Sequence, residues 1–352
     1  MGVSVLLPHR DYKPGVGVQS LHPDYKPAVR LQSLQYEPGT RGQLLTFVVP
    51  ARNGCNLSCS FCIVRQRREI TETLLRPEEM ARFIREAAER APIFTLAIQG
   101  YEPLLAESLP YTQAILATGR FLGVPATVVT NGTKLVDAVD LLATLAPNKI
   151  AISLDAASAD IHDRIRGVAG AWAASVEGIK RAIEVLAPRT KLVVQSVLLP
   201  SKRRYLDDMP ARLREIGIDR WIINPLQRVG SDRAGAGGPV ADRTSLYRDL
   251  VILQRAADRA GVRLTVDDEF DHLGHDAVVV SQPSLRRLHV RTLPLNVDIF
   301  RLTPSGQCSV GHEILQQVTL DTPRWRPGAT RAGDFLEILT NRIDQRKIAY
   351  KV

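Results

Sequence analysis

Three of the four cysteines of this chain, Cys55, Cys59 and Cys62, lie within eight residues with the spacing Cys-x3-Cys-x2-Cys. Thiol groups this close converge only if the backbone curls around a shared point, which suits a metal ion or an iron–sulfur cluster. A structural zinc ion takes four protein ligands, and the remaining cysteine, Cys308, lies far along the sequence. A cluster of four irons held by three thiolates leaves one iron open for another ligand. The spacing therefore favours an iron–sulfur cluster.

Simpler interpretations of the three cysteines stay open on this motif alone. An odd group of three thiols cannot pair off completely in internal disulfides. Free buried cysteines are common in intracellular enzymes, but three in eight residues is dense for unrelated core thiols.

The composition describes a globular protein, with 45% hydrophobic and 24% charged residues in a chain of 352. No apolar run is long enough to span a membrane, no secretory signal is visible, and four cysteines do not form a disulfide framework. We therefore expect a cytoplasmic protein without a membrane partner. The net charge of +9 is spread over arginine-rich helices rather than gathered in a stripe, so a nucleic-acid partner is not favoured.

The first part of the chain, residues 1–42, holds a near-duplication in which His9 to Pro14 recurs as His22 to Pro27. It is rich in proline, glycine and polar residues, and it shows neither a helical nor a strand period. We interpret it as an extended N-terminal arm.

From residue 43 onward, apolar runs alternate with helical patterns. The runs predict strands at 44–49, 95–99, 126–130, 149–154, 191–198 and 220–225; the patterns predict helices at 77–90, 109–122, 135–145, 174–186, 206–216 and 245–260. Six strand–helix units in a row predict an α/β fold in which a parallel sheet curls into a partial (β/α)6 TIM-like barrel over residues 43–260. Residues 261–352 show a weaker pattern, with short strands at 263–266 and 298–302. We expect a small, irregular C-terminal α+β lobe there.

Polar residues follow several of the predicted strands, at the edge of a parallel barrel where chemistry collects. The second strand runs into Gln99-Gly100-Tyr101-Glu102-Pro103, and the third into Thr130-Asn131-Gly132-Thr133. The fourth ends in Ser153-Leu154-Asp155, where Ser153 and Asp155 share one face of the strand. Gln195 lies inside the fifth apolar strand, where a polar side chain needs a partner.

In this order, the motifs resemble those of the radical S-adenosylmethionine (SAM) superfamily over residues 44–230. The resemblance is greatest to the branch of molybdenum-cofactor cyclases and of enzymes with a SPASM extension. It implies that Cys55, Cys59 and Cys62 hold one [4Fe–4S] cluster, with Phe61 as the aromatic residue of the motif. The C-terminal part, with Cys308 as its one cysteine, resembles a degenerate SPASM or twitch-like extension without an auxiliary cluster.

The same resemblance implies the contacts to SAM. The segment of Gly100, Tyr101 and Glu102 is similar to a Gly-Gly-Glu-Pro motif that binds the amino group of SAM, with Tyr101 in place of the second glycine. Asn131 would line the cofactor site, Ser153 and Asp155 would lie on the ribose side, and Arg166 would clamp the carboxylate. Gln195 is a candidate contact to cofactor or substrate.

The function implied by the resemblance is reductive cleavage of SAM to a 5′-deoxyadenosyl radical, which abstracts hydrogen from a small-molecule substrate. The electron would come from a donor such as flavodoxin or ferredoxin. A peptide-modifying maturase is the alternative within the superfamily; a non-catalytic iron–sulfur or zinc regulatory protein is the alternative outside it. Cys308 is a candidate hydrogen-atom donor, against the plainer interpretation of a small buried residue.

Overall fold

The computed structural model describes residues 42–49, 55–62, 74–187, 189–199, 203–226, 243–267, 289–291, 297–310 and 323–349. Its strands are β1 (Gly42–Val49), β2 (Ile93–Gly100), β3 (Ala126–Thr130), β4 (Lys149–Ser153), β5 (Lys191–Leu198), β6 (Arg220–Pro225), β7 (Arg263–Asp267), β8 (His289–Arg291), β9 (Val297–Leu302) and β10 (Cys308–Val310). Its helices are α1 (Pro77–Ala88), α2 (Leu109–Leu122), α3 (Leu135–Leu145), α4 (Ala159–Arg166), α5 (Ala171–Leu186), the 3₁₀ turn η1 (Arg203–Leu206), α6 (Met209–Glu215), α7 (Arg243–Ala260) and α9 (Ala332–Ala349).

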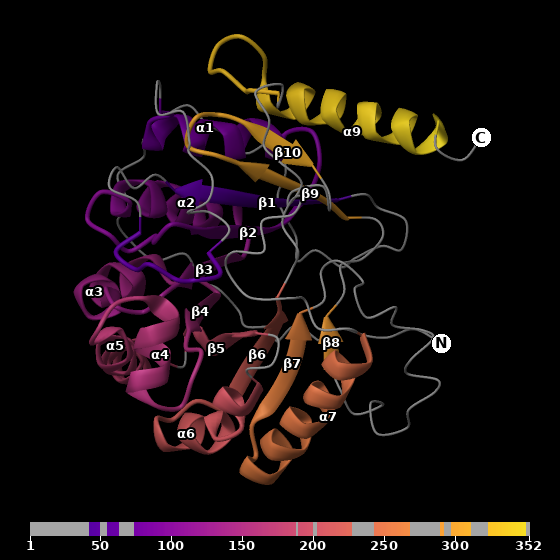
Figure 1. The fold of residues 1–352 in the computed structure, drawn as a ribbon. Coiled ribbons are helices and arrows are strands. Elements are labelled where there is room, and N and C mark those ends of the chain that lie inside the picture. Colours follow the sequence, from indigo (N-terminus) through magenta and orange to yellow (C-terminus); the bar gives the residue numbers. More distant parts are fainter. Residues whose placement is uncertain are drawn as a thin grey trace.

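All the described strands belong to one sheet, in the order β10-β9-β1-β2-β3-β4-β5-β6-β7-β8. The pairings from β9 through β1 to β8 are parallel, and β10 pairs with β9 in the antiparallel sense. Figure 1 shows the strands following an arc, with α1 to α6 along its outer side. The fold is therefore a partial TIM-like barrel, as the sequence predicts.

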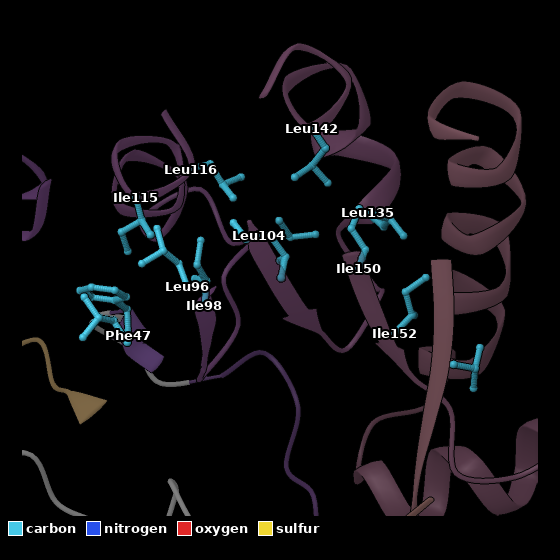
Figure 2. Close-up of a cluster of buried hydrophobic side chains, with 14 of the residues drawn as sticks. Phe47, Leu96, Ile98, Leu104, Ile115, Leu116, Leu135, Leu142, Ile150 and Ile152 are labelled. Atoms are coloured by element: carbon cyan, nitrogen blue, oxygen red, sulfur yellow. The ribbon is translucent and has the colours of Figure 1, made fainter. Parts of the chain in front are cut away.

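The hydrophobic core lies between the strands and the helices that cover them. Alternate strand residues such as Leu96 and Ile98 on β2, or Ile150 and Ile152 on β4, are fully buried against the helices. Figure 2 shows these side chains meeting residues of α2 and α3. The opposite side of the sheet, which we call the inner face, carries the intervening residues.

Local sequence signals explain where the helices begin and end. At the start of α1, Pro77 occupies the first turn, and the Glu79 carboxylate accepts a hydrogen bond from Arg76 N at 2.7 Å. At the end of α2, Gly123 adopts φ 69°, a left-handed conformation that glycine tolerates best.

The structure confirms the six predicted strands to within two residues at each end, and it reproduces the helices at 109–122 and 135–145. The predicted N-terminal arm lies outside the described residues, apart from Gly42 at the start of β1.

The C-terminal elements extend the barrel sheet rather than forming a sheet of their own. β7 pairs with β6, and β9 pairs with β1 at the other end of the arc. Helix α9 lies against α1, where Ala332 N donates to the Glu86 carboxylate at 2.8 Å and Arg90 forms an ion pair with Asp334. The predicted boundary between residues 260 and 261 therefore falls within a continuous sheet. Among the described helices, none has the length and apolar character needed to cross a membrane.

Two glycines with similar backbone angles allow a test of how tightly the β3–α3 turn is packed. Gly132 has φ 85°, and an added Cβ would lie 2.8 Å from Ile152 Cγ2; Gly123 has φ 69° and open space around it. We expect Gly123→Ala to cost about 1–2 kcal/mol for the left-handed backbone alone. Gly132→Ala should cost about 1–3 kcal/mol more because of overpacking. Equal losses in urea unfolding experiments would contradict this packing.

Candidate functional site at the carboxyl ends of the strands

The cysteine loop that follows β1 is fastened to the end of α4. Ser58 N donates to Arg166 O at 2.8 Å, and Ser60 N donates to Ile165 O at 3.2 Å. The next residue, Gly167, has φ 73°, and a Cβ there would lie 2.6 Å from Ser58 O. Glycine is thus required both by the backbone angle and by the close approach. The loop is held by a distant helix end, which fixes where its thiols lie.

The thiols of this loop influence one another electrostatically. Burial raises the pKa of Cys55 to about 11, and the neighbouring Cys59 adds to the rise. Burial also raises the pKa of Cys59, with a further contribution from Cys62 and an opposing one from Arg166. Cys55 and Cys59, whose ionised forms are disfavoured by burial, form with the partly buried Cys62 a donor set suited to a positively charged metal centre.

The three thiols of the loop are partly buried, and none is in a disulfide. Within the part of the chain that the structure describes, no three His, Cys, Asp or Glu side chains surround the position of one ion. A four-iron cluster binds each thiolate to a different iron, so its ligands lie further apart than those of one zinc ion. In their chemistry, three thiols of one loop fit the cluster that the sequence predicts.

Glu102 lies just beyond β2, after Gly100 with φ 118°. Its carboxylate is 1% exposed and accepts hydrogen bonds from Thr130 Oγ1 at 2.6 Å, Asn131 N at 2.7 Å and Leu104 N at 3.1 Å. Burial raises the pKa of Glu102 to about 6, although these hydrogen bonds oppose the rise. The group is therefore an oriented anion near neutral pH.

Asn131, which follows β3, joins this carboxylate to the cysteine loop. Its side-chain Nδ2 donates to Asn56 Oδ1 at 2.8 Å and lies 3.6 Å from Cys55 Sγ. Its Oδ1 accepts from Thr133 N at 2.9 Å and from Thr133 Oγ1 at 2.7 Å. The side chain is thus fixed at both ends.

Asp155 and Arg166 form a buried ion pair beside the second thiol. Arg166 Nε lies 2.6 Å from Asp155 Oδ2, and the two side chains are 9% and 1% exposed. Arg166 Nη1 reaches Cys59 Sγ at 3.6 Å, and the guanidinium carbon lies 5.3 Å from the centre of the Phe61 ring. Val197 N, on β5, donates to Asp155 Oδ1 at 2.9 Å.

His162 supports this pair from α4. Its Nδ1 accepts a hydrogen bond from Asp155 N at 3.1 Å, so the proton of the neutral ring lies on Nε2. Burial lowers the pKa of His162 to about 4, and the nearby Arg166 lowers it further. A neutral imidazole that holds the backbone of Asp155 fits a structural role.

Ser153 and Gln195 lie side by side on the inner face, where β4 and β5 pair residue for residue. Gln195 Nε2 donates to Ser153 Oγ at 3.3 Å. Below them, the inner face carries small side chains at Val129, Ala151 and Val193, which are direct partners across β3, β4 and β5.

Cys308 lies apart from this network. It pairs with Leu302, which pairs with Phe47, and all three side chains belong to the hydrophobic core. Burial raises the pKa of its thiol well above the ordinary range. Its role as a hydrogen-atom donor stays a prediction that nothing in these contacts supports.

The sequence did not single out several residues that complete the site. Asn56, Thr133 and Val197 bind the predicted residues directly. Asn56 fills a variable position between two cysteines, and Val197 acts through its backbone, so no side-chain pattern could have identified them. Thr133 directly follows the Asn131-Gly132 turn, which is the one signal that pointed to it.

Comparison with known proteins points to one family. Residues 49–220 match the model of the radical SAM superfamily. An AdoMet-dependent heme synthase of Methanosarcina barkeri is 33% identical over 129 residues, which are 36% of this chain and 36% of the relative. GTP 3′,8-cyclase 2 of Mycobacterium bovis is 34% identical over 149 residues, or 39% of this chain and 41% of the relative. The chain thus matches about two fifths of each relative's length.

Among solved structures, SuiB of Streptococcus suis bound to S-adenosylmethionine has a TM-score of 0.63 at 16% identity, covering 84% of this chain and 66% of that one. At this identity the likeness concerns the fold. The match to the family model, which includes the cysteine loop and Glu102, identifies the chain as a member of the radical SAM superfamily.

Proposed function

We propose that this chain is an enzyme that reductively cleaves SAM and takes a hydrogen atom from a small-molecule substrate. One observation carries the proposal. Asn131 donates a hydrogen bond to the thiol of Cys55 and another, from its backbone N, to the buried carboxylate of Glu102. Arg166 donates to the thiol of Cys59 and forms an ion pair with the buried carboxylate of Asp155. Thiolates for a cluster and charged groups for an amino acid thus belong to one network at one edge of the sheet.

Cys55, Cys59 and Cys62 would hold a single [4Fe–4S] cluster. Such a cluster would supply the electron that reductive cleavage of SAM requires, and the 5′-deoxyadenosyl radical released from SAM would abstract the hydrogen atom from the substrate. The protein's part is to orient the ligand and exclude water. Glu102 offers a fixed negative charge to the ammonium group, and Arg166 offers a fixed positive charge to the carboxylate. Ser153, Asp155 and Gln195 would face the ribose side.

Two further residues would shape the site around this ligand. Gly100 lets the backbone turn towards the inner face, because φ 118° suits glycine. Tyr101, which is half-buried just after β2, takes the place of a glycine in the similar motif and would add a side chain there. An electron donor of the flavodoxin or ferredoxin type would complete the reaction.

The substrate could also be a peptide. The solved structures of similar fold include SuiB bound to its precursor peptide SuiA, with a TM-score of 0.62 over 84% of this chain. We favour a small molecule because peptide-modifying enzymes of this superfamily often carry extra cysteines, whereas residues 261–352 of this sequence hold one, Cys308.

The central test is production of 5′-deoxyadenosine by anaerobically reconstituted protein given SAM and dithionite. We expect the wild type to release 5′-deoxyadenosine and methionine in equal amounts. Cys59→Ser should lose bound iron and the activity together, because one of three cluster ligands is gone. Cys308→Ala is the matched control, since this core cysteine should not affect iron content.

Two outcomes would contradict the proposal. Protein that binds a cluster but leaves SAM intact would favour a non-catalytic iron–sulfur regulator. Protein that binds one zinc ion and no iron would exclude the cluster.

SAM binding should weaken as the pH falls through about 6, because burial raises the pKa of Glu102 to that value. Protonation removes the negative charge that attracts the ammonium group. Below the pKa, the dissociation constant should rise about tenfold per pH unit. Equilibrium dialysis between pH 5.5 and 8 measures this dependence.

Glu102→Gln serves as the comparison for that experiment. The variant should bind SAM weakly at every pH, and its dissociation constant should not change as the pH passes through 6. The same pH dependence in the variant as in the wild type would assign the titration to another group.

A further inference from the structure

Two of the three cysteine sulfurs accept hydrogen bonds from side chains of the SAM site. Asn131 Nδ2 lies 3.6 Å from Cys55 Sγ, and Arg166 Nη1 lies 3.6 Å from Cys59 Sγ. Neither donor belongs to the cysteine loop: Asn131 follows β3, and Arg166 ends α4. The rigid elements of the barrel therefore bring both donors to the thiols.

The orientation of Asn131 follows from its other partners. Thr133 N can only donate, and it lies 2.9 Å from Asn131 Oδ1. The amide oxygen must therefore face Thr133, which leaves Nδ2 facing Cys55 and Asn56.

Arg166 is oriented just as firmly. Its Nε is paired with Asp155 at 2.6 Å, and its plane lies by the ring of Phe61. With the side chain only 9% exposed, water cannot readily replace these partners. Nη1 is thus directed at Cys59 before any ligand binds.

Donors placed in this way affect a cluster's affinity for an electron. Reduction adds negative charge, part of which resides on the sulfur ligands, so a hydrogen bond or a nearby cation stabilises the reduced form more than the oxidised form. We propose that Asn131 and Arg166 are positioning residues that raise the reduction potential of the cluster. The inference rests on the proposed function only for the presence of that cluster.

The test is a potentiometric titration of the reconstituted protein without SAM, followed by electron paramagnetic resonance of the reduced cluster. Asn131→Leu removes one donor, and Arg166→Gln removes the other together with its charge. Both variants should show a lower potential than the wild type, with the larger shift for Arg166→Gln. Iron and sulfide content are measured on the same samples.

Matched controls distinguish the loss of a hydrogen bond to sulfur from a general disturbance of the site. Thr133→Val removes a hydroxyl bond at the far end of Asn131 and leaves the bond from Thr133 N and both donors to sulfur in place. Its potential should match the wild type. Asp155→Asn should shift the potential upward, because it removes the negative charge beside Arg166 and leaves the donors in place.

Donor variants with full clusters and unchanged potentials would overturn the inference, as would a downward shift in Asp155→Asn. If Arg166→Gln takes up no cluster, Arg166→Lys, which keeps the charge without the planar donor, takes its place. Its potential should lie below that of the wild type, and an unchanged potential would overturn the role of the hydrogen bond. A wild type that takes up no cluster would refute the proposed function itself, and this result is distinct from the others.

Discussion

The site depends on keeping one cation, Arg166, buried beside two groups that can be negative. A guanidinium removed from water is tolerated only when it is paired and hydrogen-bonded. Here Asp155 lies at 2.6 Å from Nε and Cys59 Sγ at 3.6 Å from Nη1. The backbone carbonyl of the same residue accepts a hydrogen bond from Ser58 in the cysteine loop. The main chain of Arg166 thus holds the cysteine loop in place, and its side chain holds the Asp155 carboxylate and the Cys59 thiol close together.

The residues that follow β2 and β3 are arranged in a similar way. Glu102, buried like Asp155, is satisfied by donors from β3 and from its own turn. Asn131 then connects it to Cys55, as Arg166 connects Asp155 to Cys59. Parallel strands make this possible because their carboxyl ends meet at one edge, whereas the helices and core occupy the outer side.

Much of this could be predicted from sequence because the signals are local. Continuous apolar runs marked the six strands, and polar residues directly after them marked Glu102, Asn131 and Asp155. Helix α4 was missed because it has only eight residues, and its two large apolar side chains, Ile161 and Ile165, are too few to establish a helical period. The place of β9 beside β1 could not be predicted either, because a pairing between residues near 45 and near 300 leaves no mark in either segment.

Contacts made by backbone atoms were also beyond sequence analysis. The bonds from Ser58 N and Val197 N depend on where the chain passes, not on which side chain it carries. Gly167 shows the reverse case: the residue is visible in the sequence, but its reason, a Cβ clash with Ser58, becomes clear only in three dimensions.

The central claim is that these residues seat SAM on an open iron of a cluster held by three cysteines. Electron–nuclear double resonance on the reduced cluster, with ¹⁵N-labelled SAM, tests it most directly. The account predicts a hyperfine coupling from the amino nitrogen in the wild type, and loss of that coupling in Glu102→Gln. A reduced cluster in the wild type that shows no nitrogen coupling at saturating SAM would contradict it.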